Sequence, residues 1–87
     1  MHRALARRYG HAKGVPTRLN LYVLARELKE QGGVIRRVPA ASVPHIRRCI
    51  DAGLLESSGE RVGNGWAWRL TPKGEAAVGT IAANDNA

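Results

Sequence analysis

Glycine and proline residues divide this chain into short segments, and their positions limit the helices and strands that it can form. Proline interrupts the interior of a helix because it lacks an N–H and clashes with the preceding turn, whereas glycine favours turns and helix ends. Such breaks fall at Gly32-Gly33, at Pro39, at Gly53, between residues 59 and 65, and at Pro72. Each interval accommodates one short helix or strand, and 87 residues suffice for a single domain.

Residues 17–31 have the clearest helical pattern. Apolar side chains recur there at the i, i+3, i+4 and i+7 spacing of one helix face. These residues are Leu21, Leu24, Ala25 and Leu28. Thr17 or Asn20 is expected to cap the first turn, and the charged residues of this segment, Glu27 included, are expected to face solvent.

The segment 34–41 has two interpretations. Val34, Ile35 and Val38 are β-branched, and Pro39 prevents a long regular helix. One interpretation is a short helix of about two turns, and the other is a brief strand that runs into a turn. We favour the short helix.

Residues 42–52 form the next expected helix. Ser42 is a good N-cap residue, Pro44 suits the first turn, and Gly53 is a good left-handed stop. Val43, Ile46 and Ile50 share one face, which is expected to be buried. The opposite face carries polar and charged side chains, together with a proline. These residues are Pro44, His45, Arg47, Arg48 and Asp51.

The second half of the chain is typical of a β-hairpin followed by a helix. Residues 54–57 and 66–70 are expected strands, and the polar, glycine-rich segment 58–65 is the expected loop between them. The alternation places Trp66, Trp68 and Leu70 on one side, which we expect to be the core side. A last helix is expected from Thr71-Pro72 through residue 78 and as far as residue 81.

Basic residues are concentrated in the first half of the chain. The net charge is +7, and residues 1–48 contain eleven Lys and Arg against two acidic residues. Residues 49–87 contain three against five. This asymmetry predicts a basic face that attracts polyanions, and the predominance of arginine suits phosphate and guanine. The alternative is a basic surface that only keeps the protein in solution.

Several classes of protein are not expected. Cys49 is the single cysteine, so an internal disulfide is excluded, and no apolar run approaches the ~20 residues of a membrane span. His2, His11 and His45 do not stand at metal-ligand spacing with Cys49. Phosphate-binding glycine loops and paired carboxylates are not found. We therefore expect no enzyme, metal, cofactor, small-molecule effector or membrane partner, and a cytoplasmic, nucleoid-associated protein.

Two stretches resemble bacterial winged helix-turn-helix repressors of the multiple-antibiotic-resistance (MarR-like) and PadR-like type. They are IRRCIDAGLL, residues 46–55, and RLTPKGEAAV, residues 69–78. The resemblance implies an α+β fold with a three-helix core, a β-hairpin wing and a short C-terminal helix. In its order of elements the resemblance covers roughly residues 19–80, and in detail only these two stretches. The expected winged-helix domain is 17–81, after a basic flexible arm at 1–16 and before a disordered tail at 82–87. The long flanking helices through which those repressors dimerise are missing, so their dimer mode and ligand pocket do not carry over.

The expected function is sequence-specific binding of double-stranded DNA by a small transcriptional repressor, acting as a homodimer. The recognition helix would contact DNA through Ser42, Pro44, His45, Arg47 and Arg48, and the wing through Arg61 and Asn64. Other basic residues would contact phosphates. These are Arg3, Arg7, Arg8, Lys13, Arg18, Arg36 and Arg37. The alternatives are an accessory or architectural DNA-binding factor of a phage or mobile element, and a winged-helix inhibitor that binds protein.

Overall fold

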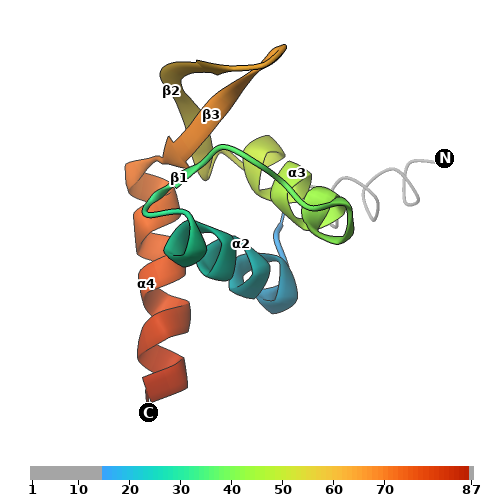
Figure 1. The fold of residues 1–87 in the computed structure, drawn as a ribbon. Helices are drawn as coiled ribbons and strands as arrows, with labels where there is room; N and C mark the ends of the chain where they lie inside the picture. Colours follow the sequence, from blue (N-terminus) through green and yellow to red (C-terminus); the bar gives the residue numbers. More distant parts are fainter. Residues whose placement is uncertain (1–14, 87) are drawn as a thin grey trace, which may run out of the picture.

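The computed structural model describes residues 15–86, and the side chains of residues 15–80. Within this range the chain forms an α+β fold of three helices and a three-stranded antiparallel sheet with strand order β1-β3-β2. The elements are α2 (Arg18–Glu30), β1 (Val34–Ile35), the 3₁₀ turn η1 (Ala40–Ser42), α3 (Val43–Asp51), β2 (Leu55–Val62), β3 (Gly65–Leu70) and α4 (Pro72–Asn86). Helix α2 packs against both α3 and α4, and the β2–β3 hairpin projects away from the helices (Figure 1).

Helix α2 begins and ends as its local sequence predicts. Thr17 is the N-cap, and a capping box joins it to Asn20: the Asn20 N–H donates to Thr17 Oγ1 at 3.1 Å, and the Thr17 N–H donates to Asn20 Oδ1 at 2.7 Å. The helix is followed by Gly32 and Gly33, whose φ angles of 77° and 101° lie in the left-handed region. Glycine adopts this conformation without the steric cost of a Cβ, so the glycine pair ends the helix.

The buried face of α2 is broader than its apolar spacing indicates. Leu24 and Leu28 are buried as predicted, but Val23 and Glu27 are also buried, and Glu27 is only 3% exposed. The expectation that Glu27 faces solvent is therefore wrong. The cause is tertiary, because α2 lies between α3 and α4 and is covered from two sides.

The expected short helix at 34–41 is also wrong, and the brief strand followed by a turn is correct. Val34 pairs with Arg69 and Ile35 pairs with Trp68, which adds a third strand to the hairpin. Pro39 then has extended backbone, with φ −58° and ψ 149°, before the chain enters η1. The β-branched pair therefore takes a sheet partner more than 30 residues away, which no local pattern specifies.

Helix α3 has the predicted bounds but a different buried face. Pro44 lies in the first turn, and Gly53, with φ 81°, follows the last turn. Ile46 is buried and Ile50 is half-buried, whereas Val43 is 37% exposed, against expectation. Cys49 is fully buried instead, so the core side of α3 is centred on Ile46 and Cys49.

The hairpin strands are longer than expected and the loop is shorter. Val62 pairs with Gly65, so the connection is Gly63-Asn64, with a positive φ at Gly63 as a type II′ turn requires. Most of the predicted loop at 58–65 is therefore strand. Residues 58–60 lie opposite the single residue Ala67, and this irregularity is accommodated at Gly59, which has φ 91°.

The side chains of β3 that are buried also differ from those that the alternation predicts. Ala67 is fully buried, Trp68 and Leu70 are half-buried against the core, and Trp66 is 46% exposed. The prediction that Trp66 is a core residue is wrong. Trp66 pairs with Arg61 near the end of the hairpin, which projects beyond the helices (Figure 1).

The two stretches that resemble winged-helix repressors meet in space at the start of α4. The Thr71 hydroxyl donates to the Gly53 carbonyl at 2.7 Å and accepts from the Gly74 N–H at 3.0 Å, and the Thr71 N–H donates to the Leu54 carbonyl at 3.0 Å. Gly74 is buried against the Leu54 backbone. Helix α4 continues to Asn86 and so includes residues 82–86, which we expected to form a tail.

The thiol of Cys49 is expected to be unreactive in the folded protein. Cys49 lies within the core, and burial raises its pKa from an ordinary 9.0 to about 11, although Arg48 opposes this shift. Since the unfolded thiol ionises first, the free energy of unfolding should fall as pH rises from 9.0 to about 11. A thiol-specific reagent such as DTNB should label the chain only after guanidinium is added, and rapid labelling of the native protein would contradict the burial.

Candidate nucleic-acid interface

A buried polar cluster anchors the start of α3 to α2. The Ser42 hydroxyl donates to Glu27 Oε2 at 3.3 Å and accepts from the Arg26 guanidinium at 3.4 Å, and Arg26 also lies 3.5 Å from the Glu27 carboxylate. Ser42 occupies the N-cap position, but its side chain makes no capping hydrogen bond, and it is 1% exposed. Its predicted roles as a capping side chain and as a DNA contact are therefore wrong, because its hydroxyl is bound to Glu27 beneath the surface.

Gln31 holds the segment between β1 and η1. Its Oε1 accepts hydrogen bonds from the N–H groups of Arg36, at 2.8 Å, and Arg37, at 3.1 Å. Its Nε2 donates to the Arg37 carbonyl at 2.7 Å and to Glu27 Oε1 at 3.1 Å. One amide side chain thus satisfies backbone groups that a helix would otherwise pair, so this segment stays extended. Sequence reasoning missed Gln31, since a polar residue before a glycine pair carries no distinctive signal.

His45 faces α2 on one side. Its Nδ1 lies 2.8 Å from Asn20 Nδ2, and the ring is half-buried. Because the amide nitrogen donates, Nδ1 accepts and the proton of the neutral ring is on Nε2. Asn20 thereby joins the capping box of α2 to α3. The sequence predicts a base contact for His45, and the structure gives it this positioning contact.

The outward face of α3 carries Pro44, Arg47 and Asp51, which are all exposed as predicted. Arg48 is half-buried and is engaged in a contact of its own. Arg37, in the segment before η1, is exposed. Among the side chains that the structure describes, no carboxylate forms an ion pair with Arg37 or Arg47.

Arg36 links the segment after β1 to the hairpin. Its Nε lies 2.8 Å from Glu60 Oε2, and both side chains are about half exposed. The hydrogen bond with Arg36 lowers the pKa of Glu60, and the same bond raises the pKa of Arg36. A solvent-exposed pair of this kind is weak, so a phosphate can replace the carboxylate as the partner of Arg36. The predicted phosphate contact of Arg36 therefore requires this exchange.

The hairpin carries the predicted wing residues near its end. The Arg61 guanidinium lies over the Trp66 ring, 4.8 Å from the ring centroid, and Asn64 is exposed in the turn. This cation–π contact holds the long Arg61 side chain against a flat surface. Sequence reasoning placed Trp66 in the core and therefore missed it as an exposed aromatic group.

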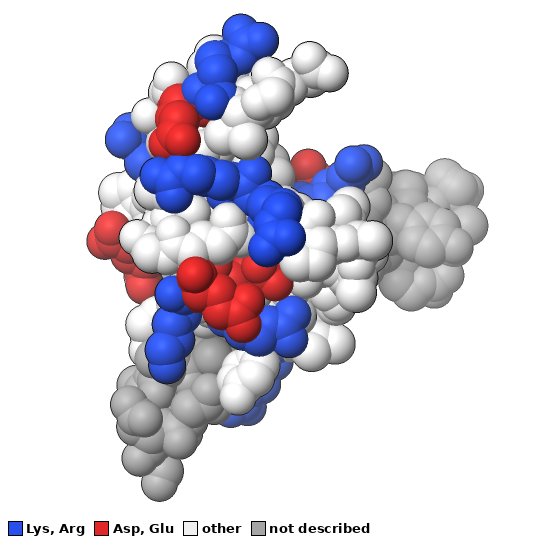
Figure 2. All heavy atoms as spheres, in the orientation of Figure 1, with Lys and Arg blue, Asp and Glu red and all other residues white. Residues whose placement is uncertain are grey.

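Basic side chains form a band across the middle of one face. Figure 2 shows Lys and Arg side chains in the region of α3 and the segment after β1, with acidic groups above and below them. Arg18 is exposed at the start of α2. The predicted arm contacts Arg3, Arg7, Arg8 and Lys13 lie outside the described residues.

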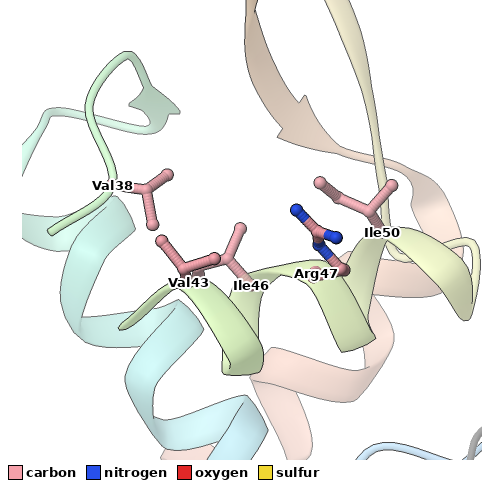
Figure 3. A pocket seen from close by; sticks show the side chains of 5 residues that line it. All are labelled: Val38, Val43, Ile46, Arg47 and Ile50. Atoms are coloured by element: carbon pink, nitrogen blue, oxygen red, sulfur yellow. The ribbon is translucent and has the colours of Figure 1, made fainter. Parts of the chain in front are cut away.

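A shallow apolar hollow lies beside this band, and sequence reasoning missed it. Its volume is about 160 Å³, and five side chains line it from α3 and the preceding segment (Figure 3). They are Val38, Val43, Ile46, Arg47 and Ile50. The three aliphatic residues of α3 are those expected in the core, but only Ile46 is fully buried.

The described part of the chain contains neither a metal-ligand cluster nor a membrane-spanning helix. In residues 15–80, no three His, Cys, Asp or Glu side chains come together as a metal ion would require. None of the described helices has the length and apolar character needed to cross a lipid bilayer.

The chain was compared with protein-family models, curated proteins and solved structures. Neither the family models, nor the curated proteins, nor the solved structures gave a match.

Proposed function

We propose that this chain binds double-stranded DNA sequence-specifically, with α3 in the major groove and the β2–β3 hairpin as a wing. The observation that carries the proposal is the exposed surface formed by α3 and the segment before η1, where Arg47 and Arg37 have no carboxylate partner among the described residues. The major groove is about 12 Å wide and accepts one α-helix, and guanidinium groups bind phosphates and guanine.

The order of elements also supports a winged helix-turn-helix. A helix, a short strand, a helix and a hairpin follow one another, and the short strand pairs with the second hairpin strand. In this interpretation the helix before the recognition helix is reduced to η1, and Gln31 replaces its backbone hydrogen bonds. The wing would present Arg61 and Asn64 to the DNA backbone or the minor groove.

A role as a small transcriptional repressor fits this proposal, because such proteins need sequence-specific binding and little else. An accessory DNA-binding factor of a mobile element would use the same surface with less discrimination between sequences. The two differ in how much the protein prefers its selected site to other DNA.

Selection from a random duplex library, followed by fluorescence anisotropy, tests the proposal. We expect the selected duplex to bind about 10³-fold or more tightly than a scrambled duplex. Affinity should fall steeply between roughly 50 and 200 mM salt. The logarithm of the association constant should decrease linearly with the logarithm of the salt concentration, by a slope of about 0.9 for each neutralised phosphate. Equal, salt-sensitive affinity for both duplexes would favour the accessory factor. Absence of duplex binding even at roughly 50 mM salt would reject DNA as the ligand.

A further inference from the structure

The apolar hollow lies on the surface that we propose to face DNA, although most of that surface is basic or polar. Ile46 forms its buried floor, Val38 and Ile50 are half-buried, and Val43 is 37% exposed. All four side chains border the same space in Figure 3. Exposing aliphatic side chains to water is unfavourable, and a bound ligand that covers them stabilises the complex.

The major groove presents one methyl group, the 5-methyl of thymine. The other base-edge groups there are hydrogen-bond donors and acceptors, apart from the small C5–H of cytosine. A hollow of about 160 Å³ that is open to solvent has room for a methyl group against its aliphatic lining.

Arg47 lines the same hollow, as Figure 3 shows. It lies four residues after Val43 and three before Ile50, so these side chains share one face of α3. A guanidinium beside a bound methyl group is positioned to reach O6 and N7 of a neighbouring guanine. We infer that the hollow receives the thymine methyl group of a base step in which thymine neighbours guanine, with Arg47 on the guanine. This inference rests on the proposed DNA binding and specifies what the site reads.

Charge decides between DNA and a second copy of the chain as the occupant. Arg47 borders the hollow, Arg37 immediately precedes Val38, and neither has a carboxylate partner among the described residues. A second copy would bring another net charge of +7 toward them. The phosphates that flank a thymine methyl bring the complementary charge.

Single thymine-to-uracil replacements in the selected duplex test the inference, because uracil lacks only the methyl group. We expect a loss of affinity of about fourfold at a thymine that neighbours guanine, and little change at other thymines. Replacing uracil at that position by 5-methylcytosine, paired with guanine, should restore part of the methyl contact.

Protein variants then show whether the hollow is responsible. Val38→Ala with Val43→Ala should bring the thymine-to-uracil affinity ratio close to one. Val15→Ala, at another exposed valine, is the matched control and should keep the wild-type ratio. Thermal unfolding followed by circular dichroism checks that the variants are folded.

The outcomes separate this inference from the proposed function. Tight duplex binding with equal affinities for thymine and uracil at every position would overturn the methyl contact and leave DNA binding standing. A selected site without a thymine next to guanine would do the same. Loss of self-association in the double valine variant, measured by sedimentation, would assign the hollow to a second copy. Failure to bind any duplex would overturn both proposals.

Discussion

Replacing Gly74 by alanine is expected to lower the free energy of unfolding by about 3 kcal/mol. A Cβ at this position would overlap the Leu54 carbonyl oxygen and approach Leu70 Cδ2 to 2.9 Å. The obstacle is backbone, so no side-chain rotation relieves it, and α4 must move away from the residues that follow α3. Urea unfolding followed by circular dichroism measures this loss.

Gly79→Ala is the matched control, because Gly79 lies in the same helix and an added Cβ there meets no atom within 4 Å. This substitution should raise the free energy of unfolding by up to about 1 kcal/mol, since alanine has the higher helix propensity. If both variants changed stability by the same amount, the close contact between Gly74 and Leu54 would be refuted.

The double substitution Arg37→Ala with Arg47→Ala is expected to weaken binding to the selected duplex by about 100-fold or more. One base-reading arginine contributes about 1–3 kcal/mol of discrimination, and each lost phosphate contact lowers the salt slope by about 0.9. Anisotropy titrations at several salt concentrations measure both quantities. Stability should change little, because both side chains are exposed and neither forms an ion pair with a described carboxylate.

Lys29→Ala with Lys73→Ala removes the same charge from exposed positions on α2 and α4. Only the general attraction of a basic protein to DNA falls in this control, so its affinity should drop by a few-fold at most at roughly 150 mM salt. Equal losses in the two double variants would show that net charge alone drives binding, and the assignment of α3 as the recognition helix would fail.

Part of the candidate site could be predicted from the sequence. Arg47 and Arg61 are exposed on the predicted helix and hairpin, and Asn64 lies in the turn. Arg47, however, lines the same hollow as Val43 and Ile50 and does not lie on the face opposite them, as the pattern predicts. The contacts that orient the site could not be predicted. Arg36 meets Glu60 across 24 residues, and Asn20 meets His45 across 25. Nothing in the spacing of either pair distinguishes it from other charged or polar pairs.

The sequence by itself determined where several elements begin and end. Thr17 and Asn20 cap α2, Gly53 ends α3, and Thr71 caps α4, because each of these conformations depends on hydrogen bonds and sterics within about four residues. Such signals are complete in the local chain. Ser42 is the exception, because its hydroxyl binds Glu27 and makes no capping hydrogen bond.

Only the tertiary structure decided which surfaces are buried and which remain open. Val34-Ile35 became a strand because β3 was available to pair with it. Glu27 is buried because α3 and α4 cover α2 and the distant Ser42 binds its carboxylate. Val43 remains exposed because an extended segment and the single 3₁₀ turn η1, and not a full second helix, precede α3. The physical reason is that burial depends on partners far away in the chain, and apolar spacing specifies a face without specifying what will cover it.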